Sequence, residues 1–167
     1  DIGCASGHYV DAFSQAGFDA YGCDISPAAL QKADKGIRQR LILSDVEDLA
    51  NMGTYQVLTC FDTLEHIYDI HNFAQACAKL LDAQGLLMLT TPNRDTFLRH
   101  VQGRKWVSFK IPEHVTFFSR RHLEKLFGPY FEPVHCQVEW RPTRLEFLGR
   151  KMEEIYGGVG HRIRDIF

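Results

Sequence analysis

The stretch that decides the fold is Asp1-Ile2-Gly3-Cys4-Ala5-Ser6-Gly7, where an acidic residue and a run of small residues stand directly before a helix-like segment. Small residues let the backbone turn sharply and approach a ligand closely. The next segment, residues 8–16, reads as a helix that Gly17 ends. Nucleotide-binding α/β folds place such a turn at the end of a strand. The opening therefore predicts a ligand-binding turn at the edge of a sheet.

Outward from this turn, strand-like and helix-like segments alternate over the first ninety residues. Strands are expected at 19–23, 39–43, 55–61 and 86–91, and helices at 8–16, from Ser26-Pro27 onward and at 71–81. Several of the strand segments are continuous apolar runs, which is typical of strands buried on both faces. Alternation of this kind favours right-handed crossovers and a parallel sheet. The sequence thus predicts an α/β fold with a doubly wound, mostly parallel sheet and helices on both faces.

After Pro92 the pattern changes. Residues 93–118, here called the lid segment, lack clear periodicity and are expected to form a long functional loop. A helix at 119–127, a strand at 134–140 and a helical tail at 143–156 are expected beyond it. The predicted organisation is one domain over 1–140, with the lid segment as an insertion, and a helical extension of that domain over 141–167.

A second acidic residue at a strand end, Asp24, indicates which class of ligand the turn binds. It ends the second expected strand, where a carboxylate can accept two hydrogen bonds from a ribose diol. A nicotinamide site requires Gly-x-Gly-x-x-Gly, whose third glycine lets the helix pack closely. Counted from Gly3, the corresponding positions hold Ala5 and His8, and glycine returns at Gly7. The pattern favours a nucleoside that carries an amino acid and no phosphate over a nicotinamide dinucleotide.

On these residues the chain resembles the class I S-adenosylmethionine-dependent methyltransferases. Residues 1–7 resemble their motif I, Asp24-Ile25 their ribose-binding motif II, and Asp45-Val46 the pair that flanks the adenine. Residues 61–66 resemble the segment beneath the methionine portion, and residues 85–93 the strand-five hairpin. The resemblance implies these cofactor-binding residues: Asp1, Gly3, Cys4, Ala5, Gly7, Asp24, Ile25, Asp45, Val46, Phe61 and Asp62.

A second group of residues indicates which branch of this family the chain resembles. Trp106 and the run from Pro112 to Ser119 are similar to the branch related to ubiquinone-biosynthesis and small-molecule O-methyltransferases. This implies a Rossmann-like methyltransferase fold with S-adenosyl-L-methionine as cofactor and S-adenosyl-L-homocysteine as product. The implied reaction moves a methyl group to a small-molecule acceptor, at oxygen. Because the chain begins at the motif I aspartate, most of strand one is expected to be missing, which leaves the fold truncated at its N-terminal end.

His114 and His66 are the expected catalytic residues. A hydroxyl acceptor needs a base to remove its proton, and histidine is suited to that task near neutral pH. His114 follows the basic, aromatic lid segment, and His66 lies in the segment expected near the cofactor. The alternative for His114 is a structural hydrogen bond that holds the lid segment against the sheet. The alternative for the whole chain is a catalytically silent methyltransferase-like scaffold or partner subunit.

We expect no metal from the sequence. Asp62, Glu65, His66 and His71 could supply ligands, but the spacing of five between the two histidines does not place them on one helical face. The five cysteines are scattered and contain no Cys-x-x-Cys pair, which argues against both a disulfide framework and a structural zinc site.

Charge and composition indicate which kinds of binding partner to expect. The hydrophobic content of 45% and the charged content of 24% are those of an ordinary globular protein, with no apolar run approaching the roughly 20 residues of a membrane span. Residues 1–91 carry five basic and twelve acidic side chains, whereas residues 94–125 carry eight basic and three acidic ones. A basic lid over an anionic substrate is one reading, and ordinary surface charge is the other. The acidic overall balance disfavours nucleic acid. A cytoplasmic location is expected.

Overall fold

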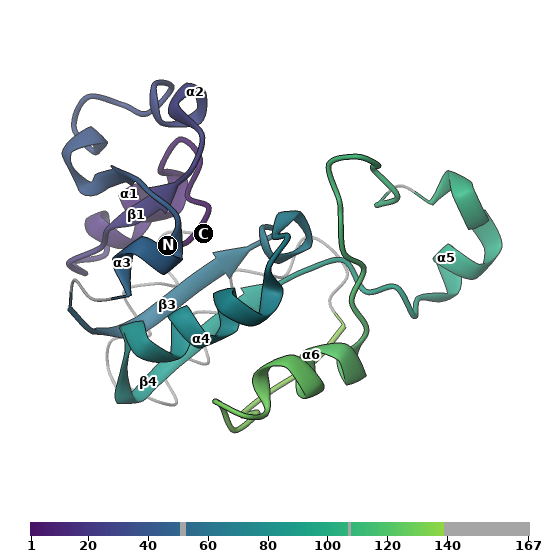
Figure 1. Cartoon of the computed structure of the whole chain (residues 1–167). Helices are drawn as coiled ribbons and strands as arrows, with labels where there is room; N and C mark the ends of the chain where they lie inside the picture. Colours follow the sequence, from purple (N-terminus) through teal and green to yellow (C-terminus); the bar gives the residue numbers. More distant parts are fainter. Residues whose placement is uncertain (51–52, 107, 139–167) are drawn as a thin grey trace.

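The computed structural model describes residues 1–50, 53–106 and 108–138, and parallel strands alternate with helices along them (Figure 1). The strands are β1 (Gly22–Asp24), β2 (Leu41–Leu43), β3 (Tyr55–Phe61) and β4 (Leu81–Thr90). The α-helices are α1 (His8–Gln15), α2 (Pro27–Leu30), α3 (Val46–Leu49), α4 (Ile70–Leu80), α5 (Phe97–Gln102) and α6 (Arg120–Phe127). Short 3-10 turns are η1 (Arg38–Arg40), η2 (Leu64–His66) and η3 (Gly103–Lys105).

The strands form two parallel pairs, β1 with β2 and β3 with β4. Ile2 connects the pairs: it forms a parallel bridge with Cys23, and its N–H donates to the Thr59 carbonyl over 2.7 Å. Because these strands are parallel, the end of β1 and the end of β3 face the same edge. The α/β class with parallel strands is thus confirmed.

Local sequence explains where the helices begin. The Ser26 side chain accepts the N–H of Ala29 and caps α2, with proline in the first turn as expected. Asp69 caps α4 in the same way. Ser119 caps α6, and His122 returns a hydrogen bond to the Ser119 backbone, which completes a capping box.

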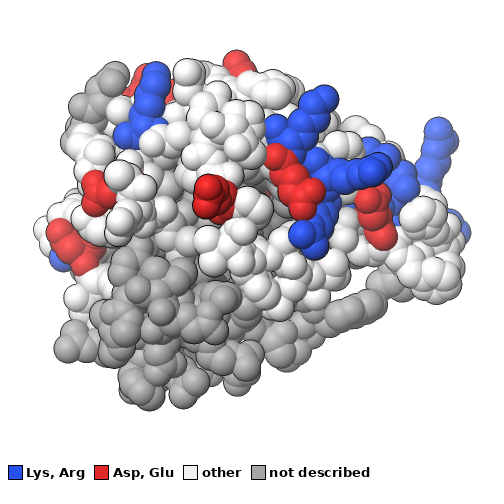
Figure 2. Space-filling model, turned by 90° about the horizontal axis from the view of Figure 1, so that it is seen from below, with Lys and Arg blue, Asp and Glu red and all other residues white. Residues whose placement is uncertain are grey.

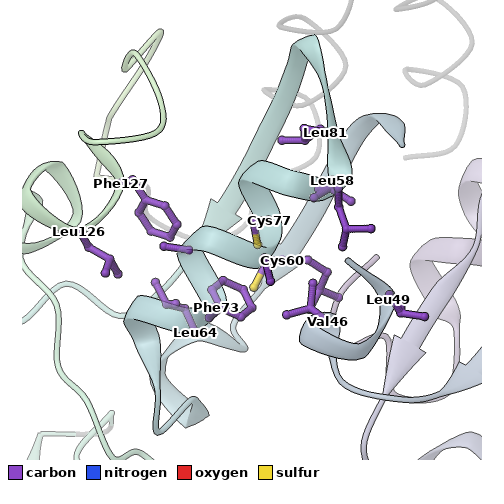
Figure 3. Packing of buried hydrophobic residues seen from close by; sticks show 14 of the residues in the cluster. Val46, Leu49, Leu58, Cys60, Leu64, Phe73, Cys77, Leu81, Leu126 and Phe127 are labelled. Carbon is purple, nitrogen blue, oxygen red and sulfur yellow. The ribbon is translucent and has the colours of Figure 1, made fainter. Parts of the chain in front are cut away.

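The main core lies between β3 and the helices α3, α4 and α6. Figure 3 shows side chains of α4 packed beside those of β3, with the α3 residues on one side and the α6 residues on the other. Burial of this apolar surface fixes α4 against the strand pair. The labelled members are Val46, Leu49, Leu58, Cys60, Leu64, Phe73, Cys77, Leu81, Leu126 and Phe127.

Several expected boundaries were wrong. The first strand runs over 22–24 instead of 19–23, because the partner strand β2 has only three residues. The strand expected at 86–91 begins earlier, at Leu81. The lid segment contains α5 and η3 in place of uninterrupted loop, and Thr96 caps α5.

The strand expected at 134–140 is wrong over its described residues, 134–138. Residues 134–138 have no regular structure, and Val134 and Val138 are 63% and 60% exposed, so none of the described strands covers them. Residues 139–140, the helix expected at 143–156 and the extension 141–167 lie outside the described residues. Within the described part of the chain, no helix has the length and apolar character needed to cross a membrane.

Candidate functional site

The candidate site is built on the edge where β1 and β3 end. The turn of residues 3–7 lies beside this edge, because the N–H groups of Gly3 and Cys4 both donate to the Cys23 carbonyl, over 2.9 and 3.0 Å. Gly3 and Gly7 have φ of 72° and 80°, and Ala5 has φ of 48°. A positive φ at alanine is uncommon and is held in place only by its surroundings. The small-residue turn predicted from the sequence is therefore present and tightly held.

The two glycines of this turn face protein. A Cβ on Gly3 would overlap the Thr63 side chain, and one on Gly7 would lie 2.9 Å from a Leu41 methyl carbon. Cys4 is likewise buried, in a small core with Val10, and its thiol is part of that packing. The exposed part of the turn is Ala5-Ser6. A branched side chain at Gly7 would consequently disturb the fold before it met a ligand.

Asp24 holds the turn to the end of β1. One carboxylate oxygen accepts the N–H of Ala5 over 2.8 Å, and the other accepts the N–H of Ser26 over 2.8 Å. Each carboxylate oxygen can accept a second hydrogen bond, so the side chain retains acceptor capacity for a diol. Its neighbour Ile25 is 74% exposed, which is high for a large apolar side chain beside a polar rim. Asp24 and Ile25 thus offer a carboxylate and an apolar surface side by side.

Asp45 and Val46 occupy different environments. The Asp45 side chain accepts the N–H of Asp48 over 3.0 Å and caps α3, the structural role that an acidic residue at this position commonly has. Val46 is 3% exposed and packs in the main core, so only its backbone can reach a ligand. The structure therefore supports a helix-capping role for Asp45. Its second carboxylate oxygen is the one that could accept a hydrogen bond from an adenine amine.

Phe61 and Asp62 end β3 at the same rim. Asp62 has φ of 49°, and its N–H donates to the Thr90 carbonyl over 3.0 Å. The ring of Phe61 meets that of Tyr9 from α1 edge to face, with centroids 4.8 Å apart. The positive φ values at Ala5 and Asp62 thus lie on neighbouring loops, and strained backbone of this kind concentrates at binding sites. Asp1 is held nearby, because the Thr59 hydroxyl donates to its carboxylate.

The histidines predicted to be catalytic lie together. The rings of His66 and His114 meet edge to face with centroids 4.8 Å apart. Nδ1 of His66 lies 2.7 Å from the Glu113 carbonyl oxygen, which can only accept, so in the neutral ring Nδ1 carries the proton and Nε2 carries the lone pair. His66 is exposed, whereas His114 is 7% exposed. The arrangement makes Nε2 of His66 the ring nitrogen prepared to accept a proton.

Glu65 belongs to this cluster, although it was not among the site residues predicted from the sequence. Its side chain is 2% exposed and accepts a hydrogen bond from the Thr91 hydroxyl over 2.9 Å. Its backbone carbonyl accepts the N–H groups of Val115 and Thr116, over 2.9 and 3.2 Å. Glu65 therefore connects η2 to the lid segment. The sequence signal was the adjacent Glu65-His66 pair. That pair indicates a cluster only once the fold has brought His114 beside it.

His71 and Asp62 do not join the cluster. Glu65, His66 and His114 each offer a ligand atom within 4.8 Å of the others, and this group of three contains only two of the four residues considered for a metal from the sequence. His71 lies in the first turn of α4 and is exposed. The histidine that completes the group comes from the lid segment, far along the chain.

The lid segment is basic at its surface. Figure 2 shows Lys and Arg side chains gathered on the side of the molecule where α5 lies in Figure 1. Its ends are close together, because Asn93 and Phe118 form a parallel bridge. Exposed basic residues of the segment are Arg104, Lys105 and Lys110. The positive charge inferred from the sequence is thus concentrated on the side of the molecule that carries α5.

The cysteines of the core are poor nucleophiles. Burial raises the pKa of the Cys4 thiol to about 11 and that of Cys77 to about 12. Burial also raises the pKa of the thiols of Cys23 and Cys60. A protonated thiol neither attacks an electrophile nor binds a metal well, so these four residues serve packing.

A cavity of about 340 Å³ lies between the two strand pairs. Its walls include residues 22–23 of β1, residues 55–59 of β3 and the rings of Phe13 and Phe18. The residues that end β1 and β3, Asp24 and Phe61, are not among its walls. Asp1 and Val46, two of the expected cofactor-binding residues, are among its walls, so the cavity borders the candidate site on their side.

Comparison with known proteins gives a consistent picture. The model of a family described as "Methyltransferase domain" matches residues 1–130. The ubiquinone biosynthesis O-methyltransferase of Bordetella avium is 32% identical over 121 residues, which cover 67% of this chain and 50% of the relative. The protein of the same name from Methylococcus capsulatus is 30% identical over 128 residues, covering 71% and 54%. The chain thus spans about half the length of the curated relatives it matches.

Proposed function

The chain belongs to the class I S-adenosylmethionine-dependent methyltransferases, and from that premise we propose that it methylates a small molecule at oxygen. The observation that carries the proposal is the position of the His66–His114 pair, directly after the strand end that completes the candidate cofactor rim. Relatives named for O-methylation support oxygen as the accepting atom.

The rim fits the cofactor in its chemistry. Asp24 retains acceptor capacity for the two ribose hydroxyls, the exposed face of Ala5-Ser6 permits close approach, and Ile25 offers an apolar surface for a base. The bound cofactor supplies an electrophilic methyl group on a sulfonium sulfur. We assign the methionine portion to the Asp62 side of the rim, since that strand end leads directly into the histidines.

The sheet that supports this rim is proposed to be doubly wound. The two parallel strand pairs, the bridge of Ile2 to Cys23 and the hydrogen bond of Ile2 to Thr59 support the proposed order β2, β1, Ile2, β3, β4. That order reverses direction between β1 and β3, and ligands of open α/β sheets bind at such a switch point. Gly3 and Asp62 both lie beside it.

In the proposed reaction the histidine pair removes the acceptor's proton. Nε2 of His66 accepts the proton of the acceptor hydroxyl, while its Nδ1–H stays on the Glu113 carbonyl. His114 packs against the same ring and holds its orientation. A general base contributes about 10²–10⁴ in rate, and alignment of the reacting atoms contributes more. The basic lid segment favours an acceptor with negative charge.

The test combines two measurements on the full chain. Calorimetry with S-adenosylhomocysteine should show binding at one site. Turnover with a panel of phenolic and carboxylated hydroxy compounds should fall about 10²–10⁴-fold in His66→Asn, with cofactor affinity unchanged. His71→Asn, an exposed histidine outside the pair, should retain the parent rate. Cofactor binding without turnover on any acceptor would favour the silent scaffold instead, and no cofactor binding would end the proposal.

A further inference from the structure

We propose that the aromatic rings of Tyr9 and Phe61 bind the sulfonium group of the cofactor and distinguish it from the neutral product. The inference rests on the proposed function and deepens it, since it concerns which residues of the same rim recognise the charge that the reaction removes. Tyr9 was not among the site residues expected from the sequence. Phe61 was expected there only as part of the segment beneath the methionine portion.

The two rings lie between the two loops assigned to the cofactor. Tyr9 is in the first turn of α1, two residues after Gly7, and Phe61 is the last residue of β3, directly before Asp62. The ring centroids are 4.8 Å apart, and both residues are half-buried. The rings therefore connect the turn of residues 3–7 with the strand end to which we assign the methionine portion.

The geometry of the pair fits an alkylated cation. The planes of the two rings are inclined at 63°, so the rings form two walls of a corner. The face of an aromatic ring carries negative potential, and inclined rings bind quaternary ammonium groups in many proteins. A sulfonium is similar, because its positive charge spreads over the carbon atoms attached to sulfur. An aromatic face also has no lone pair to take the methyl group, whereas a carboxylate or an imidazole has one.

The charges around the pair favour a cation as well. Residues 1–31 and 53–78, which include α1, β1 and β3, contain no lysine or arginine. The same rim carries the carboxylates of Asp24 and Asp62. An excess of negative charge stabilises a bound cation relative to a neutral ligand of the same shape. The basic side chains of the lid segment lie on the side of the molecule that carries α5 (Figure 2).

The attraction ends when the methyl group has been transferred. Transfer to the acceptor oxygen breaks the bond between the methyl carbon and sulfur, and the electron pair of that bond stays on sulfur. The acceptor's proton passes to His66. The product is then a neutral thioether, which the ring faces no longer attract as a cation. The Tyr9–Phe61 pair thus adds affinity for the cofactor that the product does not receive, which favours exchange of product for fresh cofactor.

Calorimetry on the full chain tests this inference by comparing S-adenosylmethionine with S-adenosylhomocysteine in the absence of acceptor. Tyr9→Leu should weaken binding of S-adenosylmethionine about 2–30-fold and that of S-adenosylhomocysteine less than about twofold. Tyr9→Phe keeps the ring and should bind both compounds as the parent does. The matched control is Phe18→Leu, which should leave both affinities unchanged. The Phe18 ring is also half-buried and packs against Phe13 of α1, but it lines the cavity between the strand pairs.

A second series keeps the shape of the ring at position 9. Phenylalanine analogues with increasing numbers of ring fluorines withdraw electron density from the ring face. Affinity for S-adenosylmethionine should therefore fall stepwise, while affinity for S-adenosylhomocysteine stays constant. This series decides the question if Tyr9→Leu fails to fold by circular dichroism.

The two proposals fail in different ways. If the parent chain binds both compounds and loss of the Tyr9 ring weakens both equally, only the sulfonium contact is refuted. The same holds if fluorination leaves S-adenosylmethionine binding unchanged. A parent chain that binds neither compound refutes the proposed function, and the sulfonium contact with it.

Discussion

The imidazole rings of His66 and His114 meet edge to face at 4.8 Å between centroids, although one belongs to the turn after β3 and the other to the end of the lid segment. His114 is buried among protein atoms, and His66 is open to solvent. Under the proposed function the pair divides its tasks: His66 presents a nitrogen to the acceptor, and His114 packs against the His66 ring and holds its orientation.

This relationship predicts different outcomes for two substitutions of His114. His114→Phe fills the same space without an unpartnered nitrogen, so the melting temperature should stay or rise. Turnover should fall by less than the roughly 10²–10⁴ expected for loss of the base His66, because the phenyl ring still packs against the His66 ring. His114→Ala should lower both turnover and melting temperature, since it leaves a cavity. Full turnover in His114→Phe would show that the residue is purely structural.

Asp24→Asn should weaken cofactor binding at least tenfold. The substitution removes the charge from hydrogen bonds worth about 1.5–3 kcal/mol each. It also releases one of the two backbone N–H groups that the carboxylate holds, so a small drop in melting temperature is expected. Asp82→Asn, the same charge change near the start of β4, is the control and should bind normally. A change under threefold in calorimetry would make Asp24 a turn residue only.

Ile25→Ser should weaken cofactor binding about tenfold without changing stability. The side chain is 74% exposed in the free protein, so its loss removes little packing. Covering an isoleucine side chain contributes about 1.5–3 kcal/mol when it becomes buried. Val134→Ser, at another exposed apolar residue, serves as the control. Equal affinities for parent and variant would place the adenine elsewhere.

Glu47→Gln should stabilise the protein at neutral pH. Partial burial, together with the carboxylates of Asp45, Asp69 and Asp48, raises the pKa of Glu47. The folded state then holds the Glu47 proton more tightly than the unfolded chain does. The contribution of Glu47 to the free energy of unfolding is therefore complete below the ordinary glutamate range and is lost as pH rises through the raised pKa.

The expected gain for that variant is below about 1 kcal/mol, because the side chain is partly exposed to solvent. It should appear as a higher melting temperature at pH 7 and vanish in acid below the ordinary glutamate range. Glu132→Gln, an exposed control, should show no such dependence. A variant less stable than the parent at pH 7 would contradict the prediction.

Thiol labelling should separate Cys136 from the other four cysteines. Cys136 is exposed, whereas the others are buried and have pKa values raised by that burial. At pH 8 the native protein should react rapidly with one equivalent of maleimide, and with five in denaturant. Rapid native labelling of Cys4 would mean that the turn of residues 3–7 opens.

Much of the fold, and the local backbone structure of the candidate cofactor rim, was predictable because both depend on local order along the chain. The run of small residues after Asp1 requires a tight turn, Ser26-Pro27 starts a helix by its own hydrogen bond, and the apolar run over 55–61 forms a strand. Such features involve neighbours in sequence, and side-chain type limits the backbone directly.

The grouping of Glu65, His66 and His114 was decided by tertiary structure. No spacing in the sequence shows that Glu65 and His66 meet His114, because the contact depends on where the lid segment returns to the sheet. The strand expected near Val134 failed for the same kind of reason, since an apolar, β-branched run forms a strand only where a neighbouring strand accepts its hydrogen bonds. Sequence determines which local structures are possible, and packing between distant segments determines which side chains share a site.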